Sequence, residues 1–354
     1  MLGMKLKRQG NTYQWVEHDS LTIFPKTNSF KWFNPEHGDY GDPIALVQAV
    51  TRDTPNPLNF NQSISFLLKN KFTGAKPVIY DAPKKEFSYL LRDENNIDKA
   101  VKYLSETRGI NPKVVEYFAK KGILAQATRF DKAHNLYEPV IVFKNFDENA
   151  KFVGAYLEGI DQHPEIYGTH HGRRKEIVTN SDGNVGTNIS IGKPKNVILC
   201  ESNIDMMSYF ELKGNRRQLK DTMLVSMNGL KESTVSKAFQ MVMAPKYDGK
   251  TAQYMEKVNE LANNYENAYE QWLKTGATIT LAVDNDKAGL ELYKKLSEKY
   301  PNIPIKLDVP PKAKGQEKMD WNDYLKALKQ SGKPLEQELD NVEFAPEQIA
   351  IEKR

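Results

Sequence analysis

Two stretches decide the fold: Asn196-Val-Ile-Leu-Cys-Glu201-Ser-Asn-Ile-Asp205 and Ala277-Thr-Ile-Thr-Leu-Ala-Val-Asp284-Asn-Asp286-Lys-Ala-Gly289. Each begins with a short apolar, β-branched run that is typical of a buried parallel strand. Each then places carboxylates directly after the strand, and a helix-like segment follows. The loops that leave parallel strands converge at the carboxyl edge of the sheet, where ligands of open α/β sheets bind. The sequence therefore predicts an α/β fold with a mostly parallel sheet and an acidic edge.

Carboxylates gathered at one edge repel one another unless a cation lies between them. Hard oxygen ligands of this kind suit Mg²⁺ or Mn²⁺. A Glu after one strand, followed by Asp-x-Asp-x-x-Gly after a later strand, resembles the Rossmann-like Toprim domain. DnaG-type primases, topoisomerases, OLD-type nucleases and recombination proteins share that domain. The alternative interpretation is that these acids only cap the helices that follow them.

A third acidic motif, Asp320-Trp-Asn-Asp323, follows the last expected strand near residues 303–310. Its spacing places one acid at a helix N-cap and the other in the first helical turn. In primases the Toprim fold delivers an Asp-Pro-Asp pair after its final strand, and the motif here is similar. The resemblance implies catalytic roles for Glu201, Asp284 and Asp286, and a two-metal site. The implied metal ligands are Glu201, Asp205, Asp284, Asp286, Asp320 and Asp323.

The composition narrows the class of protein. The 354 residues suffice for about two or three domains, and a net charge of +4 does not by itself demand nucleic acid. The single cysteine, Cys200, excludes a disulfide framework and favours the cytoplasm; it is expected to be a buried core residue. No run approaches the ~18 apolar residues of a membrane span, and the N-terminus lacks the apolar region of a signal peptide. We expect a soluble cytoplasmic protein without membrane association.

Residues 1–80 are expected to form a small β-rich domain. Short alternating runs predict strands at 13–16, 21–24 and 29–33, and Asp42-Pro43 is a typical helix start. This order resembles the N-terminal zinc-ribbon domain of bacterial primases. The region has no cysteine, and His18 and His37 alone do not complete a four-ligand site. We therefore expect a degenerate domain without zinc, held together by its aromatic core.

Residues 81–195 are expected to form a helical and basic subdomain. Helical patterns begin at Asn96 and Pro112, and strands are predicted at 137–143 and 152–157. A basic loop follows, whose Lys175-to-Ser181 segment is similar to the Lys-Tyr-x-Asn-Ser motif of DnaG-type primases, although it is one residue longer and lacks the aromatic residue. The resemblance implies that template phosphates and the incoming triphosphate are bound by Arg173, Arg174, Lys175, Asn180 and Ser181. The alternative is a solvated run of charges.

Residues 196–330 are the expected Toprim domain, with a helical insertion near 241–275, and residues 331–354 are a polar tail. The resemblance implies a DNA primase, a nucleotidyltransferase that makes short primers from nucleoside triphosphates on single-stranded DNA. Such proteins are carried by plasmids and conjugative elements of Gram-positive bacteria, where relaxases or replication proteins are possible partners. Two alternatives stay open: a Toprim-type metal-dependent nuclease, which uses the same acids, and a non-catalytic single-stranded-DNA-binding accessory protein of conjugation.

Overall fold

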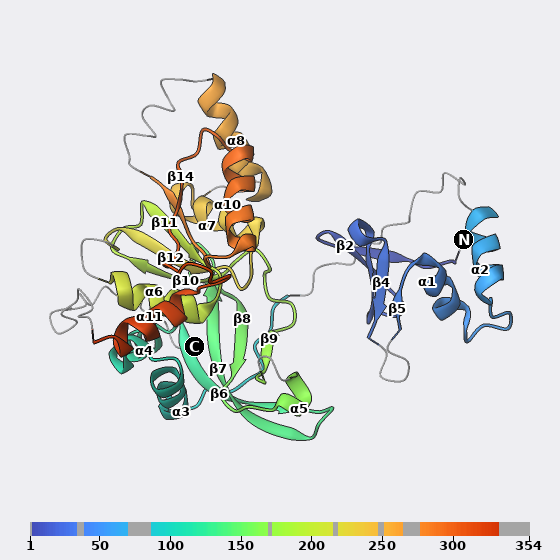
Figure 1. Ribbon diagram of the computed structural model, residues 1–354, viewed down its shortest axis with the longest axis horizontal. Coiled ribbons are helices and arrows are strands. Elements are labelled where there is room, and N and C mark those ends of the chain that lie inside the picture. The colour runs from blue at the N-terminus through green and yellow to red at the C-terminus, as the bar shows by residue number, and fades with distance from the viewer. Residues whose placement is uncertain are drawn as a thin grey trace. The chain divides into compact units, whose positions relative to one another are not determined.

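The structure is a computed structural model that describes residues 2–33, 39–69, 86–168, 172–214, 219–246, 251–264 and 277–332. The chain divides into two compact units, Met1–Lys85 and Glu86–Arg354 (Figure 1). Each unit is described below by itself. No helix in the described ranges is both long enough and apolar enough to cross a membrane.

The first unit contains an antiparallel sheet whose strands pair in chain order. The strands are β1 (Leu6–Gln9), β2 (Thr12–Trp15), β3 (Leu21–Phe24), β4 (Ser29–Trp32) and β5 (Tyr40–Gly41), followed by helices α1 (Pro43–Thr51) and α2 (Phe60–Lys69). The Asp42 carboxylate caps α1 by accepting hydrogen bonds from the backbone N–H groups of Ile44 and Ala45, both at 2.9 Å. The predicted strands and this helix start are confirmed. His37 lies outside the described residues.

Aromatic rings form much of the core of this unit. Trp32 is buried with Leu21 and Phe30, and its ring meets that of Trp15 edge-on at 5.7 Å between centroids. The His18 ring contacts the Trp15 ring at 4.2 Å. The imidazole is thus part of the aromatic cluster.

We therefore predict that the purified protein carries far less than one zinc per chain, as measured by metal analysis of the intact protein. The physical reason is the absence of thiolates from residues 1–80, since structural zinc sites in proteins need four closed ligands, usually with cysteine among them. A stoichiometric zinc signal that resists chelation would contradict this prediction.

The second unit begins with two helical segments and an antiparallel sheet. Helix α3 (Asp98–Lys102) continues into the π-helical turn η2 (Tyr103–Thr107), and α4 (Pro112–Lys120) follows. The sheet has the order β6-β7-β8-β9, with β6 (Leu124–Asp131), β7 (Leu136–Phe146), β8 (Phe152–Gly159) and β9 (Lys175–Ile177). The short helix α5 (Pro164–Tyr167) lies between β8 and β9. The predicted pairing of β7 with β8 is confirmed.

A mixed sheet of order β10-β12-β11-β13-β14 completes this unit. Strands β11 (Asn196–Cys200), β12 (Thr222–Ser226), β13 (Ile279–Ala282) and β14 (Ile305–Leu307) are parallel, and β10 (Thr187–Ile191) pairs antiparallel with β12 at the sheet's edge. Its helices are α6 (Asn203–Lys213), α7 (Glu232–Met243), α8 (Thr251–Asn264), α10 (Lys287–Lys299) and α11 (Trp321–Gln330). The predicted α/β fold with a mostly parallel sheet is confirmed.

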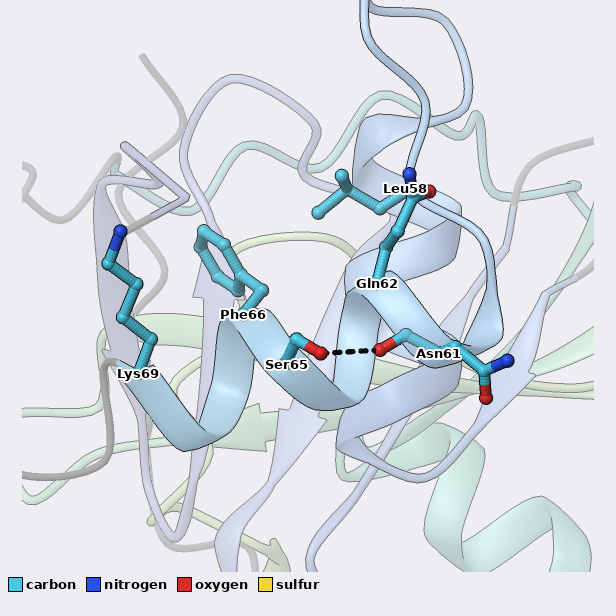
Figure 2. A pocket seen from close by; sticks show the side chains of 6 residues that line it. All are labelled: Leu58, Asn61, Gln62, Ser65, Phe66 and Lys69. Atoms are coloured by element: carbon cyan, nitrogen blue, oxygen red, sulfur yellow. Dashed lines mark hydrogen bonds between the residues drawn. The ribbon is translucent and has the colours of Figure 1, made fainter.

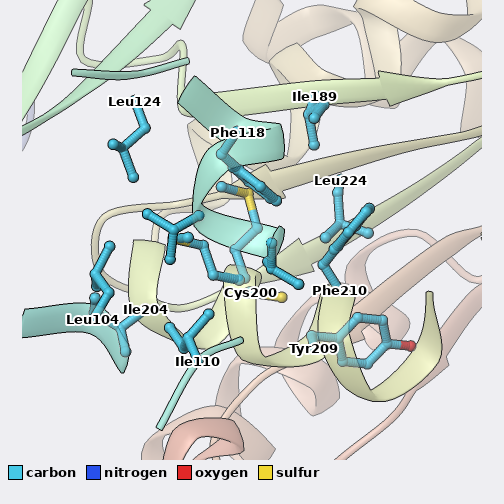
Figure 3. Close-up of a cluster of buried hydrophobic side chains, with 14 of the residues drawn as sticks. Leu104, Ile110, Phe118, Leu124, Ile189, Cys200, Ile204, Tyr209, Phe210 and Leu224 are labelled. Atoms are coloured by element: carbon cyan, nitrogen blue, oxygen red, sulfur yellow. The ribbon is translucent and has the colours of Figure 1, made fainter. Parts of the chain in front are cut away.

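Helices cover both faces of the parallel sheet, because alternate residues of each strand enter different cores. Ile198 and Cys200 of β11 belong to the cluster formed with α4, α6 and α11 (Figure 3), whereas Val197 and Leu199 belong to the cluster formed with α7 and α10. Cys200 is a buried core residue, as expected, and burial raises the pKa of its thiol. Of the expected insertion at 241–275, helix α8 is observed, and residues 265–276 lie outside the described ranges.

The two sheets of this unit are joined by side-chain hydrogen bonds. The Asn145 amide of β7 donates to the Val185 carbonyl at 2.9 Å and accepts from the Thr187 hydroxyl at 2.8 Å. The Asn188 amide donates to the Phe146 carbonyl at 2.8 Å. These bonds fix the antiparallel sheet beside the parallel one.

Helix α11 links early and late parts of this unit. The buried Trp321 indole donates to the Ala282 carbonyl at 3.0 Å, at the end of β13. The Asn322 amide donates to the Arg108 carbonyl at 2.7 Å, and the Lys329 ammonium donates to the Gly109 carbonyl at 2.6 Å. The helix therefore holds the end of η2 against the acidic edge.

Candidate active site

Three buried or half-buried acids lie at the carboxyl edge of the parallel sheet. Glu201 directly follows β11, and Asp284 follows β13 with only 3% of its surface exposed. Asp205 lies in the first turn of α6 and is 6% exposed. Its backbone N–H donates to the Ser202 hydroxyl at 3.1 Å, and one carboxylate oxygen accepts from the Asn322 N–H at 3.3 Å. The fold thus brings together acids that are distant in the sequence.

Asp286 and Asp320 cap helices and also face this edge. One Asp286 oxygen accepts from the Gly289 N–H at 2.9 Å at the start of α10, and one Asp320 oxygen accepts from the Asp323 N–H at 2.6 Å at the start of α11. One carboxylate oxygen of Asp286 and one of Asp320 therefore cap helices, as the alternative interpretation predicted. Their charges still reach the site, because both add to the rise in the pKa of the Asp284 carboxyl that burial causes.

Lys318 places a cation inside this group of acids. Its Nζ lies 2.6 Å from Asp284 Oδ2 and 3.7 Å from Asp286 Oδ2. The sequence analysis did not select Lys318 as a site residue. Its position two residues before Asp320 is the feature that could have identified it. We name residues 310–319 the lysine loop.

The acids repel one another even with Lys318 present. Burial, with the charge of Asp284 added to it, raises the pKa of Glu201 to about 7, although Lys318 opposes the rise. Burial also raises the pKa of Asp205 to about 8, with further contributions from the charges of Asp284 and Asp320. Burial likewise raises the pKa of Asp320. Each raised pKa means that the charged form of the carboxyl is disfavoured. A bound cation would stabilise that charged form.

The donor chemistry of this edge fits a divalent cation. Glu201 Oε2 and Asp284 Oδ1 are buried, and neither has a hydrogen-bond partner in the part of the chain that the structure describes. Unpaired buried oxygens of this kind are costly unless a ligand satisfies them, and carboxylate oxygens suit Mg²⁺ or Mn²⁺. Within the described ranges, no group of three or more His, Cys, Asp or Glu side chains is already arranged to hold a metal ion.

Asp323 was expected in the same cluster, but the structure places it apart. Its side chain is 63% exposed, and its carboxylate lies 3.9 Å from the Lys326 ammonium on the surface of α11. The helix turns this residue outward because Asp320 already occupies the N-cap, three positions earlier. The cluster at the sheet's edge therefore comprises Glu201, Asp205, Asp284, Asp286 and Asp320.

The structure corrects the role expected for Arg174. Its side chain is only 10% exposed, and its guanidinium lies within 2.6 Å of Asp131, 3.2 Å of Glu138 and 2.7 Å of Glu176. A guanidinium committed to three protein carboxylates is not free to bind phosphate. Arg174 is a structural residue of the antiparallel sheet, and its partners Asp131 and Glu138 could not be predicted because they lie on other strands.

The other four residues expected to bind nucleotide or DNA have varied surroundings. The Arg173 guanidinium donates to the Ile160 carbonyl and lies over the Tyr103 ring at 4.6 Å, and Lys175 is exposed. Asn180 is exposed in a left-handed turn with φ 64°. The Ser181 hydroxyl donates to the Val178 carbonyl at 2.6 Å and so stabilises that turn. Their contacts with nucleotide or DNA stay a prediction.

Arg108 is a second cation near the acids that sequence reasoning did not select. Its Nη2 lies 3.1 Å from Glu158, and its Nε donates to the Tyr103 hydroxyl at 2.8 Å. Its charge also opposes the rise in the pKa of Asp320. Arg108 and Arg173 both contact the Tyr103 ring. The two arginines therefore form a cationic group beside the acidic edge.

The Asp-x-Asp-x-x-Gly motif ends in glycine because no side chain fits at position 289. A Cβ on Gly289 would lie 2.5 Å from the Asp284 carbonyl oxygen and 3.0 Å from a Val283 methyl. We predict that Gly289→Ala displaces α10 from the strand end and destabilises the protein by about 1–3 kcal/mol, as overpacking does. Urea unfolding measures the loss. Gly183→Ala is the matched control, because an added Cβ there meets nothing within 4 Å. Equal stability of both variants would contradict the prediction.

The first unit contains a separate pocket of about 340 Å³ on α2 (Figure 2). Its lining is formed by Leu58, Asn61, Gln62, Ser65, Phe66 and Lys69, and the Ser65 hydroxyl donates to the Asn61 carbonyl at 3.0 Å. No carboxylate lines this pocket, so it offers a cation no charged ligand.

Comparison with known proteins agrees with this description of the fold. A family model described as Toprim-like matches residues 252–325, which include Asp284, Asp286 and Asp320. Among curated proteins, the chain is similar to an uncharacterized protein of Bacillus anthracis, pXO2-78. The two are 28% identical over 334 residues, which cover 92% of this chain and 84% of that protein.

Among solved structures, the chain is similar to the primase fragment of the bacteriophage T7 primase-helicase protein, at 14% identity and a TM-score of 0.37, over 89% of this chain and 90% of that one. It is also similar to the zinc-binding and RNA polymerase domains of Aquifex aeolicus primase, at 13% identity and a TM-score of 0.32, over 93% of this chain and 79% of that one. Residues 252–325, which contribute β13, β14 and three acids of the edge, are therefore Toprim-like, in agreement with the mostly parallel sheet.

Proposed function

We propose that this protein is a metal-dependent nucleotidyltransferase that makes short primers on single-stranded DNA from nucleoside triphosphates. One observation carries the proposal: acids from three separate segments meet at the carboxyl edge of a Toprim-like sheet, where two carboxylate oxygens are buried without hydrogen-bond partners among the described residues. Plasmid replication or conjugative transfer in the cytoplasm, with relaxase or replication proteins as partners, is the setting that the resemblance to plasmid-borne primases supports.

The acids of this edge would hold Mg²⁺ or Mn²⁺. Glu201 and Asp284 offer their unpartnered oxygens, Asp286 offers the oxygen that does not cap α10, and Asp205 and Asp320 surround them. When bound, a divalent cation lowers the pKa of the attacking 3′-hydroxyl and neutralises charge at the α-phosphate. The chain's contribution is to fix these carboxylates on rigid strand ends and helix starts.

The cations beside the acids would bind the substrates' phosphates. Arg108 and Arg173 are anchored on Tyr103, and Lys175 is exposed on β9. Fixed cations next to a reaction centre stabilise developing negative charge without reorganisation. The proposal assigns no phosphate contact to Arg174, because protein carboxylates already surround its guanidinium.

The direct test incubates the protein with labelled nucleoside triphosphates, Mn²⁺ or Mg²⁺ and single-stranded DNA, and separates the products on a gel. Short labelled products that require template and metal are expected. Shortened DNA without labelled product would overturn the proposal in favour of a Toprim-type nuclease. DNA binding without either product would overturn it in favour of a non-catalytic accessory protein.

A further inference from the structure

The position of Lys318 carries an inference about how the acidic edge is regulated. Its ammonium lies 2.6 Å from one oxygen of Asp284, whose other oxygen is buried without a partner. We infer that Lys318 is a tethered counter-ion of the acidic edge, and that a divalent cation must displace its ammonium in order to bind. The inference rests on the proposed function only in requiring that this edge bind a divalent cation.

The lysine loop is held in place by contacts other than the ion pair. The Asn285 backbone N–H donates to the Met319 carbonyl at 2.8 Å, and the Asn285 amide donates to the Pro310 carbonyl at 2.9 Å. The Lys312 ammonium donates to the Asn285 and Glu317 carbonyls at 3.1 and 3.2 Å. Asn285, between the two acids of its motif, thus fastens both ends of the loop. The proximity of Lys318 to Asp284 follows from these backbone contacts.

A single ammonium leaves the charge of the edge poorly balanced. Of the five carboxylates, it lies within 4 Å of two, Asp284 and Asp286, while Glu201 Oε2 and Asp284 Oδ1 have no hydrogen-bond partner among the described residues. A divalent cation brings twice the charge and can coordinate several oxygens at once. The exchange therefore favours the metal, although each binding event must first break the Lys318–Asp284 pair.

Lys318 can leave the site without unfolding the loop. Its side chain is 53% exposed, and a lysine stem can turn its ammonium into water while the backbone stays fixed. The same ammonium reduces repulsion among the acids in the metal-free protein. Lys318 therefore has two opposite effects: it stabilises the empty edge, and it lowers the apparent affinity for metal.

The test compares Mn²⁺ binding by calorimetry in the wild type, Lys318→Met and Lys314→Met. Methionine keeps the length of the side chain and removes its charge, and Lys314 is an exposed lysine of the same loop. Lys318→Met is expected to bind Mn²⁺ about two- to fivefold more tightly, the range of a partly exposed ion pair, and to melt at a lower temperature without metal. Lys314→Met is expected to match the wild type.

A second measurement uses the unmodified protein. The rate at which an amine-reactive ester labels Lys318, read by mass spectrometry, is expected to rise when Mn²⁺ is added, whereas labelling of Lys314 stays constant. Suppose that the wild type binds Mn²⁺. Equal or weaker Mn²⁺ binding by Lys318→Met, or labelling of Lys318 that does not rise, then overturns the inference about Lys318 and leaves the proposed function standing. If no variant binds Mn²⁺, the inference and the proposed metal-dependent function both fail.

Discussion

Asp284→Asn is expected to abolish detectable primer synthesis while the protein remains folded, because the metal would lose a central ligand. The Asp284 carboxylate is buried at the centre of the acidic edge, and one of its oxygens has no partner. Asparagine keeps the size of the side chain but removes the charge that a cation needs. The gel assay measures the loss of activity, and circular dichroism checks the fold. Full activity in the variant would contradict the proposed site.

The same substitution is expected to change how the metal-free protein responds to pH. Burial and neighbouring charges raise the folded-state pKa of Glu201 to about 7 and that of Asp205 to about 8, whereas acids in unfolded chains titrate near pH 4. The folded state therefore holds protons that the unfolded state releases, so the free energy of unfolding decreases as pH rises from about 5 to about 8.

Asp284→Asn removes one source of this repulsion, so its melting temperature is expected to fall less over that pH range than that of the wild type. Mg²⁺ or Mn²⁺ binds only the folded state and is expected to raise the melting temperature of the wild type more than that of the variant. Thermal melts at several pH values, with and without metal, test both expectations. Identical responses to metal would show that the Asp284 carboxylate does not hold a cation.

Arg174→Met is expected to destabilise the protein by about 3–5 kcal/mol, the cost of removing one partner from a buried ion pair. Asp131, Glu138 and Glu176 would lose their shared cation in a nearly closed site. Although burial opposes it, hydrogen bonds from His134 and Arg174 hold the pKa of Asp131 at about 2. Without Arg174, the Asp131 carboxylate would stay charged and would keep only His134, a weaker partner. Urea unfolding measures the free energy of unfolding.

Lys175→Met, at the next position of β9, is the matched control for Arg174. Lys175 is exposed, and surface substitutions usually change stability by less than about 0.5 kcal/mol. A phosphate-binding role for Arg174 predicts the reverse pattern, in which Arg174→Met leaves an equally stable protein with reduced affinity for single-stranded DNA. Unchanged stability in Arg174→Met would show that its carboxylate partners do not need it.

The sequence predicted those features that depend on neighbouring residues. Asp42 before Pro43, Asn111 before Pro112 and Asp320 before Trp321 are all observed as helix N-caps, because a cap is a contact across two or three residues. The apolar runs before Glu201 and Asp284 are parallel strands for a similar reason, since a buried strand needs only its own composition to be recognised.

Features that depend on distant partners could not be predicted. Strand β6 has few β-branched residues, and it forms because all eight of its residues pair with β7. Arg174 and Lys318 both looked like ordinary charged residues in polar segments. Arg174 became structural through Asp131 and Glu138, and Lys318 entered the site because Asn285 fastens its loop. Side-chain charge alone does not distinguish these environments.

Helix α11 has a consequence for how the protein is made. Its contacts reach back more than two hundred residues, to the carbonyls of Arg108 and Gly109. While the ribosome is still synthesising the chain, the second unit cannot complete its core until Trp321 and Leu325 have emerged, because both are buried in it. The first unit has a core of its own, so it can fold while the rest is being translated. Translation that stops before residue 321 would leave the apolar surfaces of α4 and α6 exposed to chaperones and proteases.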